Sequence, residues 1–371
     1  MTINLNLSSD QNQIVGSMSK VLCEAFPVSR LRGNHSGSPD QPRLDSLAQL
    51  GVFGLGSSED HGGSGFSIVE EMLLFTELGR HLVTPNALAA TIAARLAMAL
   101  GKPQIAKDII AGDKIACIAN ATGSFEASFA VGNLGGTTVH LLDPQGASYA
   151  LLWNDAGMAL IDCKGLETAL VASADRSVVI HRCVLPKDAV LGHISAADTT
   201  LVRQAHLLLS AMLLGMAEAT RDMAVEYAKI RVQFGQPIGA FQAVKHRCAT
   251  MAIEAQALKA QIAFAAIAER DGWPDAPLQN DAARMLAARC ALANAGANIQ
   301  IHGGIGFTAE CDAHLYLVRA HLYENIGGTR NEARARLTRS SGPLTHGPEK
   351  NDLFAIRDTR HCEAEGRGSP S

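Results

Sequence analysis

The sequence lacks a strong excess of charge of either sign. Its 32 Lys and Arg residues stand against 36 Asp and Glu residues, which leaves a formal net charge of −4 over 371 residues. Such a chain has no electrostatic reason to bind nucleic acid or an anionic membrane surface. With 47% apolar residues, it can instead bury a large core. We therefore expect a globular protein of about two to three domains, without a nucleic-acid partner.

Patterns for disulfides, metals and export are also missing. The eight cysteines show no Cys-x-x-Cys spacing, and the 13 histidines form no His-x₃-His pair with nearby carboxylates. The sequence thus predicts neither a disulfide framework nor a metal site. The N-terminus has no basic region followed by an apolar run, and no apolar run reaches membrane-spanning length; Leu207–Met216 predicts only a buried helix. We expect a cytoplasmic protein with reduced thiols and no membrane insertion.

Residues 1–112 show the periodicity of a helical domain. Apolar residues recur at intervals of three and four over four segments, and Ser67 and Glu70 have the spacing of a capping box at the start of the third. A Gly-rich break, Gly62-Gly-Ser-Gly65, precedes that helix. The expected helices are Gln11–Ala25, Arg43–Leu50, Ile68–His81 and Ala87–Ala111.

The period changes over residues 113–198. Short β-rich runs are separated by Gly, Asn, Asp and Pro at hairpin intervals, which predicts a small antiparallel β domain, either a sandwich or a barrel. Compared with the flanking helical regions, this domain is short. The expected strands are Ile115–Ala119, Thr137–Leu142, Tyr149–Trp153, Met158–Asp162 and Ser177–Leu185.

Long helices return over residues 199–339, and residues 340–371 are polar and rich in Gly, Pro and charge, as is typical of a disordered tail. An apolar segment, Leu201–Ile230, predicts one long helix. A second helix begins after residue 242, because apolar residues continue there at heptad spacing. That apolar row is Val244, Cys248, Met251, Ala255, Leu258, Ile262 and Ala265.

The stretch between these two helices has an unusual composition for a turn. It reads Arg231-Val-Gln-Phe-Gly-Gln-Pro-Ile-Gly-Ala-Phe-Gln242, and its Gly and Pro residues break the helical period. Arg231 has a structural interpretation, in which it compensates the dipole at a helix C-terminus. It also has a functional one, since a planar guanidinium suits two-pronged binding of a phosphate.

Two further motifs follow downstream. Gln300-Ile-His-Gly-Gly-Ile-Gly-Phe307 ends an Ala-rich helix, and its Gly303-Gly304 pair either stops the helix or exposes backbone N–H groups to an anion. Gly327-Gly-Thr-Arg-Asn-Glu332 contains Thr329 and Glu332 at capping-box spacing, which by itself predicts only the start of a final helix.

Together these motifs resemble those of the acyl-CoA dehydrogenase family. A fourth and weaker likeness, Glu59-Asp-His-Gly-Gly-Ser-Gly-Phe66 with Glu70 and Glu77-Leu-Gly-Arg80, matches the family's N-terminal domain. The four occur in the family's order over most of residues 45–338. The resemblance implies an α+β fold with a helical N-terminal domain, a middle β domain and a C-terminal four-helix bundle.

The resemblance also implies a flavin cofactor, FAD, and an acyl-CoA substrate. It implies electron-transfer flavoprotein as a partner, and assembly into a tetramer with copies of the chain or with a sister subunit. The reaction would be α,β-dehydrogenation, in which a carboxylate removes the α-proton. The positions implied to contact FAD, largely that of a neighbouring subunit, are Arg231, Gln233, Phe234, Gln242, Gln300, Gly303, Gly304 and Thr329.

The expected catalytic base is missing. The family commonly carries a glutamate just before the Gly-Thr pair, and this chain has Gly327 there. Some relatives supply the glutamate from the preceding long helix, at a position that falls near Ala205, between Gln204 and His206; no carboxylate stands there either. Glu324 is a candidate for a relocated base, and His206 is a weaker one because a lone His in an apolar helix is usually core. We assign no catalytic residue.

The middle domain departs from the family as well. Where the family has Thr-Glu-Pro-x-x-Gly-Ser-Asp, which holds a subunit's own flavin, this chain reads Ile118-Ala-Asn-Ala-Thr-Gly-Ser-Phe125. The family's Trp-Ile-Thr/Ser-Asn is replaced at best by Trp153-Asn154. The motifs that reach across to a partner's flavin thus survive, while those that hold the chain's own flavin do not.

Three interpretations follow. The chain is the base-lacking partner of a heteromeric acyl-CoA dehydrogenase, of the kind found among actinobacterial and proteobacterial degraders of steroid side chains. Alternatively, it is a self-sufficient homomeric enzyme with a relocated base, or a flavin monooxygenase-like relative, which needs no α-proton base. The division of surviving motifs favours the first.

Overall fold

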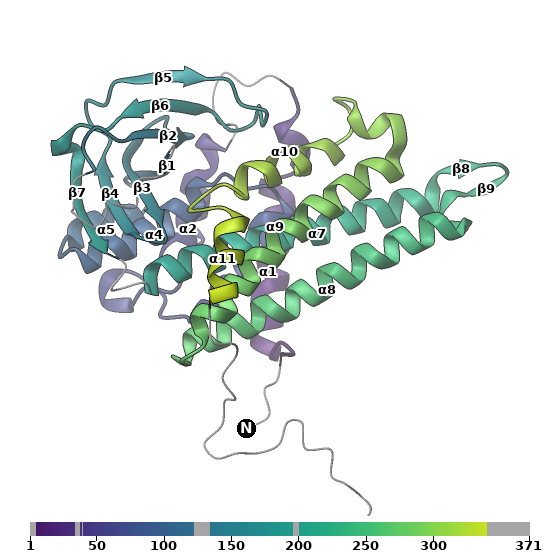
Figure 1. The fold of residues 1–371 in the computed structure, drawn as a ribbon, viewed down its shortest axis with the longest axis horizontal. Helices are drawn as coiled ribbons and strands as arrows, with labels where there is room; N and C mark the ends of the chain where they lie inside the picture. The colour runs from purple at the N-terminus through teal and green to yellow at the C-terminus, as the bar shows by residue number, and fades with distance from the viewer. Residues whose placement is uncertain (1–4, 34–37, 39, 122–133, 196–199, 340–371) are drawn as a thin grey trace, which may run out of the picture.

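The computed structural model describes residues 5–33, 38, 40–121, 134–195 and 200–339. The chain forms a helical N-terminal part, a β-sheet and a helical C-terminal part. Figure 1 shows the sheet on one side of the molecule, the long helices on the other, and helix α11 near the middle. The predicted tail, residues 340–371, lies outside the described residues.

The described residues of the N-terminal part form five α-helices, and short 3₁₀ turns lie between the first three of them. The predicted capping box at Ser67 and Glu70 is confirmed, and Ser8 and Gln11 form another one. The prediction of one helix over Ala87–Ala111 is wrong: Gly101 has a left-handed φ of 69°, and Pro103 opens a new helix after it. The helices are α1 (Ser9–Ala25), α2 (Leu44–Gln49), α3 (Ile68–Arg80), α4 (Asn86–Ala99) and α5 (Pro103–Ile110).

One seven-stranded sheet forms the middle part, in the order β5-β6-β2-β1-β3-β4-β7. It is mixed and not wholly antiparallel, because β1 and β3 run parallel. The sequence prediction also missed β5 and β7, which carry exposed or half-buried side chains and no continuous apolar run. The strands are β1 (Ile115–Ala121), β2 (Thr138–Leu142), β3 (Ala147–Asn154), β4 (Gly157–Asp162), β5 (Thr168–Val171), β6 (Ile180–Val184) and β7 (Val190–Ser195).

Over residues 200–339, the described C-terminal part forms three long helices and two shorter ones. The heptad row predicted for the second long helix is confirmed, since every member from Val244 to Ala265 is buried or half-buried. The helices are α7 (Thr200–Ile230), α8 (Gln242–Arg270), α9 (Ala276–His302), α10 (Ala313–Tyr323) and α11 (Arg330–Arg339).

Helices α7 and α8 are long and apolar enough to cross a membrane by length and composition alone. In the most apolar window of α7, however, 78% of the residues are buried inside the protein, against 39% in α8. Helix α7 is therefore the central helix of the core.

Two glycines let α7 approach α3 closely. A Cβ added to Gly79 of α3 would overlap the backbone carbonyl of Met212, and one added to Gly215 of α7 would overlap that of Thr76. Removing both side chains at the crossing allows backbone-to-backbone contact, which fixes the N-terminal helices against the C-terminal ones.

Candidate functional site

The predicted Arg231 stretch forms a small hairpin at the end of the long helices (Figure 1). Helix α7 ends at Ile230, and strands β8 (Val232–Gln233) and β9 (Gln236–Pro237) follow. The two residues at the tip have left-handed φ values, 52° for Phe234 and 79° for Gly235. Such a pair is the backbone signature of a tight two-residue hairpin, and glycine adopts it without strain.

The hairpin presents its side chains to solvent. Phe234 is 91% exposed, and its ring makes an edge-on contact with that of Phe241 at a centroid distance of 6.1 Å. Within the described part of the chain, no group pairs with the guanidinium of Arg231, which leaves its N–H donors available. A bulky apolar side chain in such an exposed position is typical of a contact surface.

The second predicted motif lies beside the hairpin. The ring of Tyr227, one turn before Arg231, stacks on that of His302 at a centroid distance of 4.2 Å. His302 ends α9 and is followed by Gly303, which has a left-handed φ of 65°. The structure therefore brings two motifs about 70 residues apart in the sequence to one end of the molecule. Seven predicted residues gather there, all exposed: Arg231, Gln233, Phe234, Gln242, Gln300, Gly303 and Gly304.

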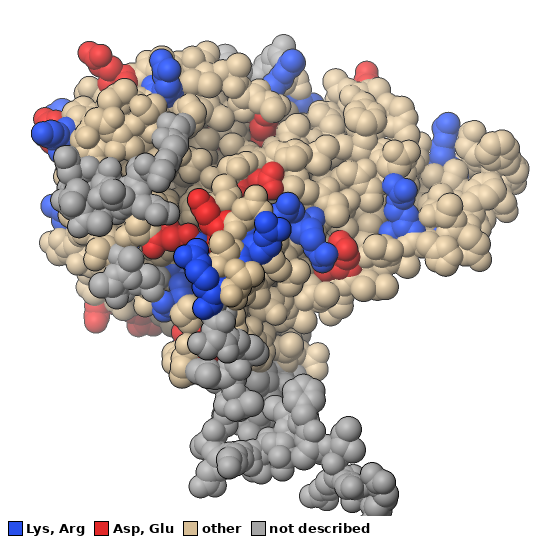
Figure 2. Space-filling model, viewed as in Figure 1, with Lys and Arg blue, Asp and Glu red and all other residues tan. Residues whose placement is uncertain are grey.

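The charge distribution around this end fits a contact surface. On the face that Figure 2 shows, few charged side chains lie on the hairpin end and Lys, Arg, Asp and Glu gather around α11, although the adjacent helix ends carry the exposed residues Glu226, Lys229, Lys245 and Arg247. Exposed apolar residues continue on the turn after α9, where Ile305 is 49% and Phe307 is 73% exposed. The exposed guanidinium of Arg231 suits an anionic group presented by a partner, whereas the Gly303 N–H already donates to the carbonyls of Gln300 and Ile299 and ends the helix.

Thr329, the eighth predicted residue, lies elsewhere. Its backbone N–H donates to Glu332, and the Glu332 N–H donates to the Thr329 hydroxyl at 3.3 Å, so the predicted capping box is confirmed. Arg284 of α9 contacts the turn just before Thr329. Because Arg284 precedes Gln300 by 16 residues in one helix, the two sites are about 24 Å apart along its axis.

Gly327, where the family commonly carries its base, is closed by a tryptophan. A Cβ added to Gly327 would overlap the indole nitrogen of Trp153, and the backbone φ of 67° is itself unfavourable for a side chain. Trp153 comes from β3 and is 1% exposed. The structure therefore places an indole ring where a glutamate side chain would have to begin.

Hydrogen bonds from Arg284 also hold the turn around Gly327 in place. The buried guanidinium of Arg284 donates to four backbone carbonyls, those of Tyr323, Glu324, Ile326 and Gly328. Burial lowers the pKa of Arg284 to about 10, so it stays charged at neutral pH. Sequence analysis missed Arg284 and noted Trp153 only as a replacement for a family motif, because the partners of both residues are distant in the chain.

His206 and Glu324, the two candidates for a relocated base, both have structural partners. The Nε2 atom of His206 is 2.7 Å from the carbonyl oxygen of Gly327, and burial lowers the pKa of His206 to about 3. A neutral imidazole that donates to a carbonyl positions the turn and does not accept a proton at that nitrogen. Glu324 caps α10, and its carboxylate lies 3.2 Å from the ring of His321.

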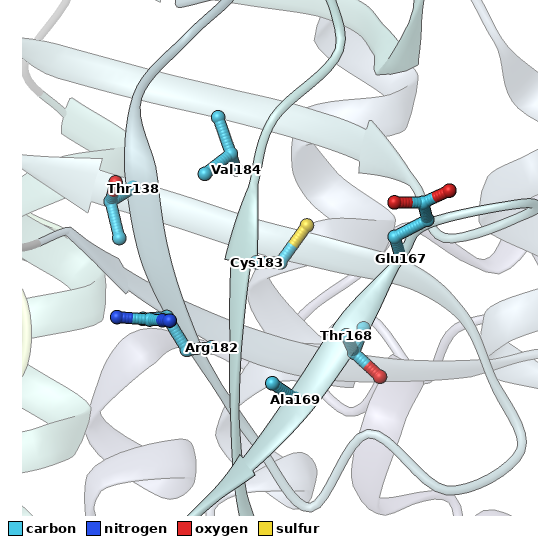
Figure 3. Close-up of a pocket in the computed structure, with 7 residues that line it drawn as sticks. All are labelled: Thr138, Glu167, Thr168, Ala169, Arg182, Cys183 and Val184. Atoms are coloured by element: carbon cyan, nitrogen blue, oxygen red, sulfur yellow. The ribbon is translucent and has the colours of Figure 1, made fainter.

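A hollow of about 530 Å³ on the outer part of the sheet contains none of the predicted site residues. Figure 3 shows Arg182 and Glu167 at opposite sides of it, with Cys183 between them on β6. Thr138 and Val184 face each other across β2 and β6. These residues form no cluster of convergent polar groups, so we assign this hollow no role.

The order of helical, β and helical parts, with an exposed arginine hairpin between the long helices, defines an acyl-CoA dehydrogenase-like fold. The family models for the acyl-CoA dehydrogenase N-terminal domain and C-terminal domain match residues 8–110 and 195–342, respectively. The chain belongs to the acyl-CoA dehydrogenase family, a family of oxidoreductases.

Two curated relatives come from Mycobacterium tuberculosis (strain H37Rv). Acyl-CoA dehydrogenase FadE34 is 36% identical over 303 residues, which cover 80% of this chain and 41% of that protein. Acyl-CoA dehydrogenase IpdE2 is 33% identical over 297 residues, which cover 78% of this chain and 83% of that protein. The chain thus spans less than half of FadE34 and most of IpdE2.

Among solved structures, the ChsE4-ChsE5 complex from Mycobacterium tuberculosis contains a chain that is similar in fold. Its TM-score is 0.74 at 20% sequence identity, and the alignment covers 92% of this chain and 100% of that one. At this identity the likeness shows the fold alone.

Proposed function

We propose that the chain is the base-lacking subunit of a heteromeric, FAD-dependent acyl-CoA dehydrogenase. A sister chain supplies the catalytic base and the contacts to the flavin ring, and this chain supplies part of the site for the adenosine diphosphate end. The observation that carries the proposal is the Trp153 indole packed against Gly327, which leaves no room for a base at the family's usual position.

The residues of the hairpin end fit the pyrophosphate and adenosine parts of FAD. No group among the described residues pairs with the Arg231 guanidinium, so its donors can reach a phosphate, and Gly303 and Gly304 carry no side chain that would keep a ligand away from the chain. Gln242 and Gln300 add amide donors and acceptors, and Phe234 offers an exposed ring for stacking. When bound, FAD supplies the hydride acceptor of the reaction.

The residues around Gly327 support the role of a non-catalytic subunit. His206 is neutral and hydrogen-bonded, Glu324 is paired with His321, and Arg284 holds the turn around Gly327. A general base contributes about 10²–10⁴-fold to rate, so a subunit without one depends on its partner for turnover.

Relatives support the choice of partner. The fold is shared with a chain from a complex of two differently named proteins, ChsE4 and ChsE5. We propose an acyl-CoA substrate, a tetramer with a sister acyl-CoA dehydrogenase chain, electron-transfer flavoprotein as electron acceptor, and a cytoplasmic location.

The test compares the lone chain, a sister chain and the coexpressed pair. Flavin absorbance and its bleaching by acyl-CoA are measured for each. We expect bleaching only in the pair. Bleaching by the lone chain would establish a self-sufficient enzyme with a relocated base, and turnover that requires reduced flavin and oxygen would establish a monooxygenase-like relative.

A further inference from the structure

A separate cavity lies in the N-terminal part of the molecule. It has a volume of about 350 Å³ and lies between α3, α4, the first turn of α7 and the loop that begins at Gly56. That loop leads into the family-like Glu59–Phe66 motif, to which the proposed flavin contacts give no role. The volume falls within the range of about 300–1,000 Å³ typical of small-molecule sites.

Each of the three helices lines the cavity in the same way. It contributes one polar residue and, one helical turn away, one apolar residue. Since the polar residues also contact one another, the cavity has a polar part and an apolar part. The pairs are Glu71 with Ile68 on α3, Arg95 with Met98 on α4, and Gln204 with Leu201 on α7.

The polar part is held in place before any ligand enters. Glu71 is 1% exposed, accepts a hydrogen bond from the Gly56 N–H at 3.0 Å and pairs with Arg95. Arg95 in turn donates to the Gln204 side-chain oxygen at 2.8 Å. A Cβ on Gly56 would overlap both the Arg95 guanidinium and the Glu71 carboxylate, so the loop can approach this pair only through a glycine.

The charges in the cavity cancel. The Arg95 guanidinium is neutralised by Glu71, and the loop adds Ser57, Ser58 and His61, with the Ser58 hydroxyl 2.6 Å from the Nδ1 of His61. Because the two charges oppose each other, neither an anionic nor a cationic ligand gains a net attraction that would offset the hydration it loses. The lining suits a neutral molecule that offers a hydrogen-bonding oxygen.

We infer that this cavity binds a small neutral molecule with an apolar ring or short chain and a ketone or hydroxyl oxygen. The oxygen meets the polar part formed by Glu71, Arg95 and Gln204, and the carbon skeleton lies on Ile68, Met98 and Leu201. A buried ion pair often stabilises a fold no better than apolar packing does. The Glu71–Arg95 pair at the cavity is therefore consistent with a role in ligand binding. The inference does not depend on flavin or on a sister chain.

The test uses four matched probes with a six-membered ring: cyclohexanone, cyclohexane, cyclohexanecarboxylate and cyclohexylammonium. Binding to the full chain is measured by saturation-transfer NMR titration. We expect cyclohexanone to bind about tenfold or more tightly than the other three, the size expected for one hydrogen bond to a charged group. Equal binding of all four, or no binding of cyclohexanone, would overturn the inference.

Variants locate the binding. Leu201→Trp fills the apolar part, and Leu317→Trp makes the same change on α10, where Leu317 is also partly buried. We expect cyclohexanone binding to be lost only in the first. If Leu201→Trp does not fold, Gln204→Leu replaces it; this variant removes one of the two partners of Arg95. Its expected effect is the loss of the preference for cyclohexanone over cyclohexane. Unchanged binding in these variants would place the ligand elsewhere and refute the assignment.

Discussion

The hairpin end and the Gly327 turn are both built from family motifs, and they differ in where their polar groups point. At the hairpin, the side chains of Arg231 and Phe234 are exposed, and the Arg231 guanidinium has no partner in the part of the chain that the structure describes. At the turn, Trp153 fills the space beside Gly327, and the side chains of His206 and Arg284 bond to backbone carbonyls of the turn. An outward-facing arginine together with a turn that has no room for a base supports our proposal that this chain completes a partner's site.

The largest effect is expected from restoring the family's glutamate. Gly327→Glu in the lone chain forces a side chain against Trp153 and into a left-handed backbone conformation. We expect a loss of about 3–5 kcal/mol in the free energy of unfolding, measured by urea denaturation, and no gain of acyl-CoA oxidation.

Gly272→Glu is the matched control. Gly272 has a φ of 65° but no atom within 4 Å of an added Cβ, so only the backbone strain, about 1 kcal/mol, remains. A stable and active Gly327→Glu chain would show that the reaction centre is open, contrary to the comparison.

Replacing the hairpin arginine tests the other region. Arg231→Ala in the mixed assembly removes a charge-assisted contact to phosphate, so flavin affinity should fall about 10- to 100-fold, as measured by fluorescence of released FAD. The stability of the lone chain should change by less than about 0.5 kcal/mol, because the guanidinium has no partner within the described residues.

Arg270→Ala is the control for that variant. Arg270 also lies at the C-terminal end of a long helix, α8, and pairs there with Asp271. Both variants remove one exposed guanidinium, so equal loss of flavin would mean that net charge alone matters and would remove the role assigned to Arg231.

The features that depend on local spacing could be predicted from the sequence, and those that depend on distant segments could not. The buried row of α8, the capping boxes and the gathering of polar residues after α7 follow from local spacing. The closing of Gly327 does not, because Trp153 is 174 residues away in the chain and meets it only after β3 packs on the C-terminal part. The parallel pairing of β1 with β3 also depends on distant segments, and β5 and β7 lack a continuous apolar signal.

Acid should weaken the turn through His206. Its pKa is about 3 in the folded chain and about 6.5 when unfolded, so the neutral form stabilises the fold fully above pH 6.5. That contribution is lost as the pH falls from 6.5 towards 3. We expect His206→Gln, which retains an N–H donor for the Gly327 carbonyl, to remove roughly 2 kcal/mol of this loss between pH 7 and pH 5.

The measurement is urea unfolding at the two pH values, with His246→Gln on exposed α8 as the control. Identical pH dependence in wild type and His206→Gln would mean that the imidazole takes up its proton in the folded chain. In that case His206 would again be a candidate for the catalytic base.

The smallest effect is expected at the cap of α11. Thr329→Ala removes the hydroxyl that accepts from the Glu332 N–H and should cost about 1 kcal/mol of stability. Flavin retention in the mixed assembly should stay unchanged, since Thr329 lies far from the hairpin. A fall as large as that for Arg231→Ala would place Thr329 among the flavin contacts that the family resemblance implies.

The most direct test of the central claim is the amount of flavin in the purified mixed assembly, measured by absorbance against the amount of each chain. If this chain completes a partner's site and has none of its own, the assembly holds about one FAD for each pair of unlike chains. One FAD for every chain, or a full complement in the lone chain, would contradict the account.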